Sequence, residues 1–312
     1  MNIVIVGQGA IGLLWHVHLN KLVQNHASVS LLPSRQLKDS NKQSIRYNYT
    51  HYQGLSEQCQ YQIAQRHHLA NAEVILVCVK SYQVKDVIND IAANLAKNAI
   101  IILAHNGMGT LADINDSIRT KHPILALLTT HGCARPMPAH ILHTGLGHSD
   151  LGILSGCLTP AQITKLTKLL NQALPSVTWQ DNIISKQWQK LAVNCVINPL
   201  TALHNVNNGA MKLPEFTKII HPLIAEFVTI ANAEGEHFKP QKILATVMQV
   251  ADATANNCSS MRADLIAQRP TEIDYINGYI HRLGIKHKIA TPINTQLWQQ
   301  IKDISADNNY HL

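Results

Sequence analysis

The first two dozen residues constrain the fold more than any other segment. An apolar run of strand length, NIVIVG at residues 2–7, leads into GQGAIG, and a helix-like segment, AIGLLWHVHLNKL, follows. This order of strand, glycine turn and helix is the context that a dinucleotide-binding GxGxxG motif needs. Gly7 permits the tight turn, Gly9 lets the backbone approach a pyrophosphate, and Gly12 lets the helix pack close to the strand. The segment therefore predicts a βαβ unit that opens a Rossmann-type, doubly wound α/β sheet.

The start of the helix after this turn is a candidate phosphate site. A helix N-terminus offers free N–H groups and a partial positive charge. We therefore expect the whole turn to bind the cofactor, with contacts from Gly7, Gln8, Gly9, Ala10, Ile11 and Gly12. A glycine-rich turn that binds no ligand is the alternative.

The end of the second strand, SVSLL at residues 28–32, bears on which nicotinamide cofactor is used. Folds that prefer NAD carry an acidic residue near this position for the ribose 2′-hydroxyl. Here the chain reads LLPSRQLK, and no acid occurs before Asp39, whereas Ser34, Arg35 and Lys38 are suited to a 2′-phosphate. The pattern favours NADPH with Arg35 as a contact, and an ordinary basic loop remains the alternative.

Two later strands place further polar residues at the same edge of the sheet. EVILVCVK (residues 73–80) is a buried-type strand followed by a helical pattern, SYQVKDVINDIAANL, and IIILAHNGMG (100–109) runs into a glycine-rich turn. Ligands bind beyond the carboxyl ends of parallel strands, so Lys80, Gln83 and Asn106 are candidate cofactor or substrate contacts. Further strands are expected at residues 123–132, 139–148 and 176–180, and we assign the middle one to a hairpin.

After about Asp181 the strand-like runs stop and helical periods take over. Gly235 and Gly284 are predicted to end two of these helices. The sequence thus predicts a cofactor-binding domain over residues 1–181 and an all-helical substrate domain over residues 182–312. A cleft between such domains is the usual place for a substrate beside a nicotinamide.

The segment KLAVNCVINPL, residues 190–200, carries an unusual polar stripe. Lys190, Asn194 and Asn198 recur every four residues in a nearly apolar run, so in a helix they share one slowly drifting face. Desolvation lowers the pKa of a lysine, which suits it to acid–base catalysis, although a lysine can also extend its amine to water. Buried amides need hydrogen-bond partners, which a polar ligand would supply. Pro199 is expected to break the helix locally.

Two later segments carry further candidates. Glu272, in RPTEIDYINGY, is either a catalytic carboxylate or part of a helix start in which Thr271 is the N-cap with Asp274 three residues on. NNCSSM, with Asn257, Ser259 and Ser260, is rich in donors and lies between two predicted helices; a simple helix-ending loop is the alternative.

Composition limits the other classes of function. The formal charge is +7, but no dense Lys/Arg run or aromatic–basic ladder accompanies it, so we expect no nucleic acid partner. Six cysteines without a CxxC pair fit a reduced, cytoplasmic compartment, and the short opening run is neither a leader nor a membrane span. None of the 18 histidines has a metalloenzyme spacing such as HExxH, so no metal site is expected.

Six segments, in order along most of the chain, resemble the ketopantoate reductase (2-dehydropantoate 2-reductase) family. They are GQGAIG, HNGMG (105–109), KLAVNCVINPLTAL (190–203), NNG (207–209), SSM (259–261) and TEIDYINGY (271–279). KLxxN…NPLTAL and TEIDYINGY are specific to this family, whereas many dehydrogenases share the glycine motif.

The resemblance implies NADPH-dependent reduction of 2-dehydropantoate to (R)-pantoate, on the path to pantothenate and coenzyme A. It implies a Rossmann domain followed by a helical domain like the C-terminal part of 6-phosphogluconate dehydrogenase, in a monomer or homodimer. Lys190 would be the general acid, and Glu272 would bind a substrate hydroxyl and support catalysis. Lys80 and Gln83 would contact the cofactor. The implied substrate ligands are Asn106, Asn194, Asn198, Asn208, Asn257 and Ser260.

The sequence departs from the family at the 2′-phosphate position. An arginine often ends the second strand, but Pro33-Ser34 stands here and Arg35 is displaced by one or two residues. Another NAD(P)-dependent hydroxyacid dehydrogenase with this architecture remains an alternative function. A non-catalytic NADPH sensor is a second alternative, and the Lys190 stripe argues against it.

Overall fold

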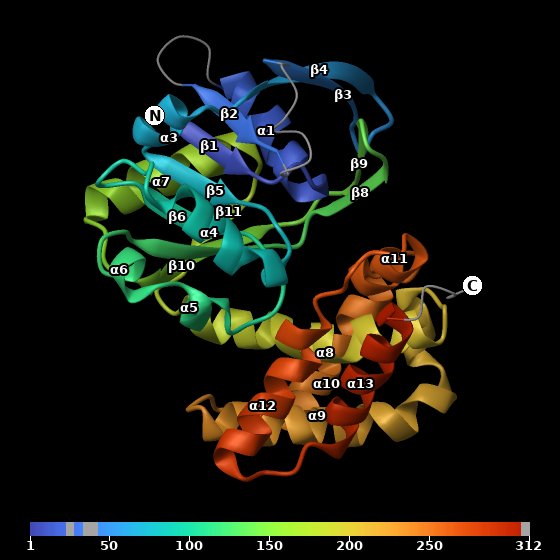
Figure 1. Cartoon of the computed structure of the whole chain (residues 1–312). Coiled ribbons are helices and arrows are strands. Elements are labelled where there is room, and N and C mark those ends of the chain that lie inside the picture. The colour runs from blue at the N-terminus through green and yellow to red at the C-terminus, as the bar shows by residue number, and fades with distance from the viewer. Residues whose placement is uncertain (23–27, 34–42, 307–312) are drawn as a thin grey trace. The chain divides into compact units, whose positions relative to one another are not determined.

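The computed structural model describes residues 1–22, 28–33 and 43–306, and it divides into two compact units (Figure 1). The sheet unit comprises Met1–His105 and Leu111–Ile184, and the helical unit comprises Asn106–Thr110 and Ser185–Leu312. No pattern in the sequence predicted that the short segment 106–110 belongs with the helices. The expected domain boundary after Asp181 stays a prediction.

The centre of the sheet unit is a parallel sheet with the strand order β2-β1-β5-β6-β7. Its strands are β1 (Ile3–Val6), β2 (Val29–Leu32), β5 (Val74–Val77), β6 (Ile100–Leu103) and β7 (Ile124–Thr129). Beyond β7 lie β10 (Ser149–Ser155) and β11 (Val177–Trp179). Beyond β2 lie β4 (Ser56–Ile63), β3 (Ser44–Thr50), β9 (His140–Gly145) and β8 (Gly132–Met137), and β8 and β9 form the expected hairpin.

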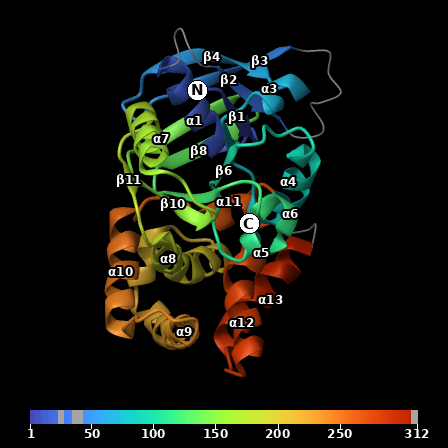
Figure 2. The same cartoon turned by 90° about the vertical axis from the view of Figure 1, so that its left-hand side faces the viewer.

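Alternation along each strand buries both faces of this sheet. Ile3 and Ile5 pack in one core with helices α1 (Ala10–Leu22) and α7 (Pro160–Ala173). Val4 and Val6 face the opposite core. That core contains residues of α3 (Arg66–Ala70), α4 (Val84–Ala92), α5 (Thr110–Asp113) and α6 (Asp116–Arg119). The 3-10 turn η1 (Ser81–Gln83) directly precedes α4. Figure 2 shows α7 and α4 on opposite sides of the strands, so the predicted doubly wound sheet is confirmed.

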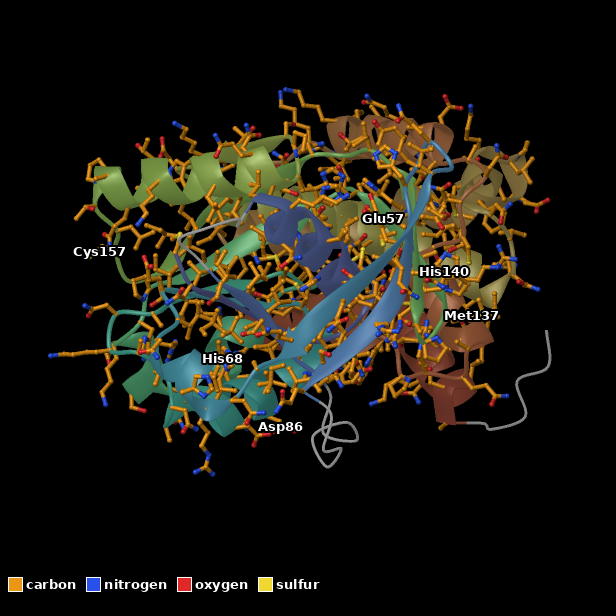
Figure 3. All side chains as sticks on the ribbon, turned by 90° about the horizontal axis from the view of Figure 1, so that it is seen from above. Glu57, His68, Asp86, Met137, His140 and Cys157 are labelled. Carbon is orange, nitrogen blue, oxygen red and sulfur yellow. The ribbon has the colours of Figure 1, made fainter. Side chains whose placement is uncertain are left out.

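Strands β3 and β4 and the β8–β9 hairpin extend the sheet over helix α1. Figure 3 shows this layer, with Glu57 on β4 and with Met137 and His140 on the hairpin. His16 of α1 lies 1% exposed beneath it and hydrogen-bonds the Tyr47 hydroxyl of β3 at 2.8 Å. The extension therefore buries the outer side of the helix that follows the glycine turn.

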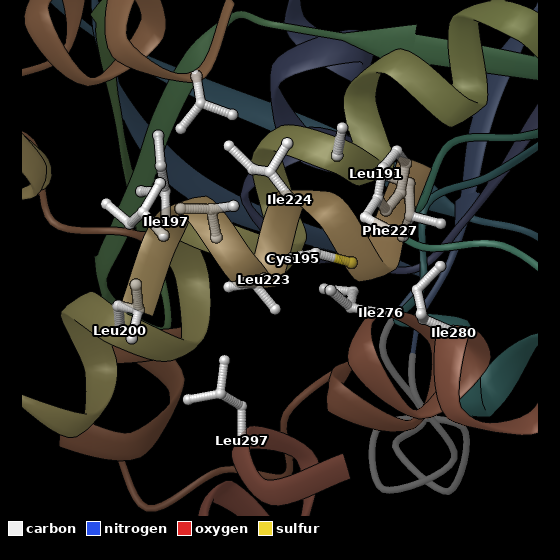
Figure 4. Packing of buried hydrophobic residues seen from close by; sticks show 14 of the residues in the cluster. Leu191, Cys195, Ile197, Leu200, Leu223, Ile224, Phe227, Ile276, Ile280 and Leu297 are labelled. Carbon is white, nitrogen blue, oxygen red and sulfur yellow. The ribbon is translucent and has the colours of Figure 1, made fainter. Parts of the chain in front are cut away.

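The helical unit packs around one long apolar helix. The helices are α8 (Ile183–Leu203), α9 (Pro214–Ala233), α10 (Pro240–Ala253), α11 (Ser260–Ile266), α12 (Asn277–His287) and α13 (Pro292–Ala306), with 3-10 turns η2 (Asn208–Lys212) and η3 (Ile273–Tyr275). Cys195 of α8 lies among Phe227, Ile276 and Ile280 in the buried core (Figure 4). In the described part of this unit there are only helices and turns, which confirms the expected all-helical second half.

Two local expectations were wrong and one was confirmed. Gly284 does not end its helix, because α12 continues to His287 and stops at Lys288, whose φ is +57°. A Cβ at Gly284 would lie 2.8 Å from the Ile289 carbonyl oxygen, so this glycine instead allows a close approach. Pro199 does not break α8, which runs on to Leu203. Gly235, with φ of +96°, follows the end of α9 as predicted.

Candidate active site

The glycine turn lies where the order of the sheet reverses. β1 sits between β2 and β5, so the crevice at its carboxyl end is the usual ligand position of a doubly wound sheet. Gly7 has φ of +104°, and a Cβ there would lie 2.7 Å from the Cys78 carbonyl oxygen. A Cβ at Gly12 would lie 2.1 Å from the Gly7 oxygen. At Gly9 the nearest atom of the described residues lies 3.8 Å from such a Cβ, so this glycine leaves room beside the backbone for a ligand.

Contacts from the sheet extension hold this turn in place. The Tyr61 hydroxyl of β4 donates to Gln8 Oε1 at 3.0 Å, and Cys133 Sγ of β8 donates to the Ala10 carbonyl oxygen at 3.4 Å. Helix α1 has no acidic residue in its first turn. Its N-terminus therefore favours an anion, and the turn fits the pyrophosphate of a dinucleotide.

The other expected cofactor contacts differ in what the structure describes. Lys80, partly buried, follows the carboxyl end of β5 and is the N-cap residue of η1, and its backbone N–H donates to Gln83 Oε1 at 3.2 Å. Gln83 thus has a structural use, with its side chain exposed at the same edge as the glycine turn. Arg35, like Ser34 and Lys38, lies outside the described residues.

The polar stripe of α8 is real, because residues 183–203 form one continuous helix. Lys190 and Asn194 are partly buried, and Asn198 is 6% exposed. Within the described residues, Asn194 Nδ2 is buried without a hydrogen-bond partner. A buried amide donor without a partner is costly, so a polar ligand is the natural acceptor for it.

Asn106 and Glu272 lie together although 166 residues separate them. Asn106 Nδ2 donates to Glu272 Oε2 at 3.2 Å, and Glu272 is 4% exposed. The segment around Asn106 is fixed on η3, because Met108 N donates to the Tyr275 carbonyl oxygen at 2.9 Å. Gly107, with φ of +83°, permits the approach, since a Cβ there would lie 2.3 Å from the same oxygen. The structure thus places Asn106 in the helical unit, with the candidate catalytic carboxylate.

The helix-start interpretation of Glu272 was right for the Thr271 side chain, which accepts a backbone N–H as a cap does, and wrong for Asp274, which bonds Trp298 instead. Glu272 is itself the N-cap residue of η3, and its side chain makes no capping hydrogen bond. Thr271 Oγ1 accepts a 3.4 Å bond from Ile273 N, and Asp274 Oδ1 accepts a 2.6 Å bond from Trp298 Nε1. Capping therefore does not explain why the Glu272 carboxylate is buried.

The remaining substrate candidates gather around η2 and the start of α11. Asn208 is 8% exposed, and its backbone N–H donates to the Asn257 carbonyl oxygen at 3.1 Å. Its Nδ2 donates to Thr254 Oγ1 at 3.0 Å, whereas its Oδ1 is buried without a partner in the described residues. Asn257 and Ser260 are exposed. This part of the unit thus offers an acceptor that a substrate hydroxyl can use.

Ser259 has a structural role that we did not assign to it from the sequence. Its side chain accepts the Arg262 N–H at 3.2 Å as the N-cap of α11 and accepts a 2.8 Å bond from Thr201 Oγ1. This joins the end of α8 to α11. The signal was present in the sequence, because a serine before a helical run is a common N-cap.

The described residues also bear on whether the chain has a metal site or a membrane-spanning helix. No group of three or more His, Cys, Asp or Glu side chains there is arranged to hold a metal ion. Among the described helices, none combines the length and the apolar character that crossing a membrane requires.

Comparison with known proteins places the whole chain in one family. Residues 3–156 match the family described as Ketopantoate reductase PanE/ApbA, and residues 182–305 match its C-terminal domain. The chain belongs to the ketopantoate reductase family. A relative from Vibrio cholerae named 2-dehydropantoate 2-reductase is 38% identical over 306 residues, which cover 97% of this chain and 98% of the relative. Another of that name, from Yersinia pestis, is 36% identical over 313 residues, covering 98% and 96%.

Solved structures share the fold of this ketopantoate reductase family member. D-mandelate dehydrogenase with NADH and anilino(oxo)acetate has a TM-score of 0.85 at 24% identity, covering 98% of this chain and 99% of that chain. A PanE/ApbA family ketopantoate reductase from Ralstonia eutropha has a TM-score of 0.84 at 22% identity, with the same coverage. These likenesses confirm the fold class, a doubly wound sheet followed by a helical domain.

Proposed function

We propose that this protein reduces 2-dehydropantoate to (R)-pantoate with NADPH, a step toward pantothenate and coenzyme A. The observation that carries the proposal is the near full-length similarity to relatives named 2-dehydropantoate 2-reductase. The buried polar atoms of the site support it. The glycine turn fits a dinucleotide, and Asn194 and Asn208 offer to a small polar molecule a donor and an acceptor that have no partner among the described residues.

Cofactor binding, substrate binding and proton delivery are assigned to different residues. Residues 1–181 hold the cofactor through Gly7–Gly12 and through Arg35, Lys80 and Gln83, and residues 182–312 hold the substrate. NADPH, when bound, supplies a hydride to the carbonyl carbon of the substrate. Lys190, as the ammonium, stabilises the negative charge that develops on the carbonyl oxygen and delivers its proton there.

The amides and the buried carboxylate orient the substrate. Asn194 and Asn198 bind it from the stripe that carries Lys190, so donor and ligands share one rigid helix. The Glu272 carboxylate accepts a hydrogen bond from a substrate hydroxyl, and a second hydrogen bond from Asn106 Nδ2 keeps the carboxylate in position. Asn208, Asn257 and Ser260 complete the polar lining. This set binds a small molecule that has both a carboxylate and a hydroxyl.

The remaining properties follow from the same observations. All six cysteines are free thiols, which supports a reducing, cytoplasmic compartment. A structural relative from Staphylococcus aureus is described as a dimeric ketopantoate reductase, and we propose a monomer or homodimer for this chain. Nucleic acid and membranes are not partners in this proposal.

NADPH oxidation with 2-dehydropantoate tests the reaction, and a panel of other 2-oxo acids tests its specificity. Preference for another 2-oxo acid would replace the proposed substrate. NADPH binding without turnover of any of them would favour a non-catalytic sensor. Repeating the assay with NADH measures how far Arg35 secures NADPH preference.

Lys190→Ala tests the general acid directly. We expect kcat to fall about 10²- to 10⁴-fold, the usual contribution of a well-placed proton donor, while the Kd for NADPH changes little. Lys186→Ala, one helical turn earlier on α8, is the matched control and should remain active. Near-native turnover of the Lys190 variant would refute its assignment.

A further inference from the structure

Pro199 removes one hydrogen bond from the middle of α8. The helix continues through this residue, and a proline has no N–H to donate to the carbonyl four residues earlier. That carbonyl belongs to Cys195, which is fully buried in the core of the helical unit (Figure 4). A carbonyl in such a place needs another donor.

The Asn277 side chain is that donor. Its Nδ2 lies 3.0 Å from the Cys195 carbonyl oxygen, and the residue is 0% exposed at the first position of α12. The same Nδ2 donates to Asn294 Oδ1 of α13 at 3.0 Å. Figure 2 shows α12 and α13 running side by side, and this bond links their first turns.

Glu226 of α9 fixes the orientation of both amides. Its carboxylate accepts from Ile293 N at 2.8 Å, from Asn294 N at 3.0 Å and from Asn294 Nδ2 at 2.9 Å. An ionised carboxylate only accepts, so Asn294 must turn its oxygen toward Asn277. Asn277 must then present its amide nitrogen, which also reaches Cys195. The direction of each bond therefore follows from the charge on Glu226.

The carbonyl held by this network belongs to the turn of α8 between Asn194 and Asn198. Cys195 follows Asn194 directly, and Asn198 directly precedes Pro199. A proline ring crowds the carbonyl four residues earlier and tends to kink a helix at that point. Fixing the Cys195 carbonyl thus sets how the turn carrying Asn194 and Asn198 is placed relative to Lys190.

We propose that Asn277 is a positioning residue for the reduction of 2-dehydropantoate, with Asn294 and Glu226 as its supports. It acts through the backbone of α8 and aligns the two stripe amides with the Lys190 amine. This role rests on the proposed function. It also explains how a helix that carries substrate ligands accommodates a proline.

A double-mutant cycle between Asn277 and Pro199 tests the proposal. Asn277→Leu keeps the approximate volume and removes the donor, and we expect kcat/KM for 2-dehydropantoate to fall about 10²-fold, with the Kd for NADPH unchanged. Pro199→Ala restores an N–H that can satisfy the Cys195 carbonyl. In that background, the loss caused by Asn277→Leu should shrink to less than tenfold. An equal loss in both backgrounds would overturn the proposal.

Two further variants separate positioning from stability. Asn277→Ser is too short to reach Cys195 and leaves α12 less crowded, so it carries the same cycle if the leucine variant does not fold. Thr295→Val removes the 2.8 Å bond between Thr295 Oγ1 and His281 Nδ1, which joins α12 and α13 without reaching α8. It should lower the melting temperature but leave kcat/KM near that of the wild type. A loss of kcat/KM in this control as large as in Asn277→Leu would show a merely structural role.

Turnover by the wild-type enzyme distinguishes a failure of the proposed function from a failure of the positioning role. If it does not turn over 2-dehydropantoate, the proposed function fails, and the positioning role fails with it. If it does, and the cycle shows no coupling, only the positioning role is refuted.

Discussion

Replacing Gly9 with alanine separates cofactor binding from folding within one glycine turn. Among the described residues, a Cβ at Gly9 in the protein without cofactor meets only the Cys78 carbonyl oxygen at 3.8 Å, an ordinary contact distance. The added methyl therefore costs the fold little. A bound pyrophosphate, however, needs the backbone of this residue within close reach. The methyl would then occupy space that the phosphate uses.

The expected loss of affinity follows from this crowding. Inserting a methyl group into a closely packed contact costs about 1–3 kcal/mol. Because about 1.4 kcal/mol is a tenfold change in an equilibrium constant, the Kd for NADPH should rise about 5- to 150-fold. Gly12→Ala should behave differently, because its Cβ would lie 2.1 Å from the Gly7 oxygen even before cofactor binds. We expect that variant to lose both affinity and melting temperature.

Two measurements test the predictions for Gly9→Ala and Gly12→Ala. They are the Kd for NADPH, from a fluorescence titration, and the melting temperature without cofactor. Gly145→Ala, in β9 with no atom within 4 Å of the new Cβ, controls for the substitution itself and should match the wild type in both. Wild-type NADPH affinity in Gly9→Ala would refute the placement of the pyrophosphate. A large fall in its melting temperature would refute the claim that the site is open.

The remaining predictions concern Glu272 and His16. Glu272→Ala should raise KM for 2-dehydropantoate and lower kcat, whereas Asp274→Asn, which alters the bond from Trp298 and the ion pair with Lys302, should change stability alone; the reverse pattern would assign Glu272 to the fold. Burial lowers the pKa of His16 from 6.5 to about 4, so between these pH values the unfolded chain binds a proton that the folded protein does not, and stability falls as the pH drops. From about pH 7 to about pH 5 this removes about 2 kcal/mol of unfolding free energy. Burial also lowers the pKa of His18 and of His131 to about 4, so these residues add to the slope. Urea titrations should show that His16→Gln loses its share of the slope and that His221→Gln, at an exposed position, keeps the full slope; an unchanged slope in the His16 variant would contradict this prediction.

Short-range patterns were sufficient to predict much of the fold. The opening strand, the glycine turn and α1 were recognised because each depends on neighbours within a few residues. The stripe on α8 was recognised for the same reason, since a spacing of four residues in a helix decides which side chains share a face. The change from strands to helices was visible in the periodicity.

The errors occurred where distant segments decide the structure. Gly284 was taken for a helix end, but its lack of a side chain serves a close approach by the Ile289 carbonyl. Pro199 was expected to break α8. The side chain of Asn277, 82 residues from Cys195 in the sequence, supplies the donor to the Cys195 carbonyl that the proline cannot supply. Neither contact has a signature in the local sequence.

The candidate site also has features that the sequence determines and features that only the tertiary structure determines. The sequence by itself determined the residue types of the site, the glycine turn and the polar stripe that carries Lys190. These features depend only on side-chain chemistry and on the spacing of neighbouring residues. Only the tertiary structure decided that Asn106 lies against Glu272 and that Thr201 donates a hydrogen bond to Ser259. It also showed that Glu226, through Asn294 and Asn277, holds the middle of α8. Such contacts depend on which buried polar atoms need partners after the chain has folded, and that need arises only when segments far apart in sequence exclude water together.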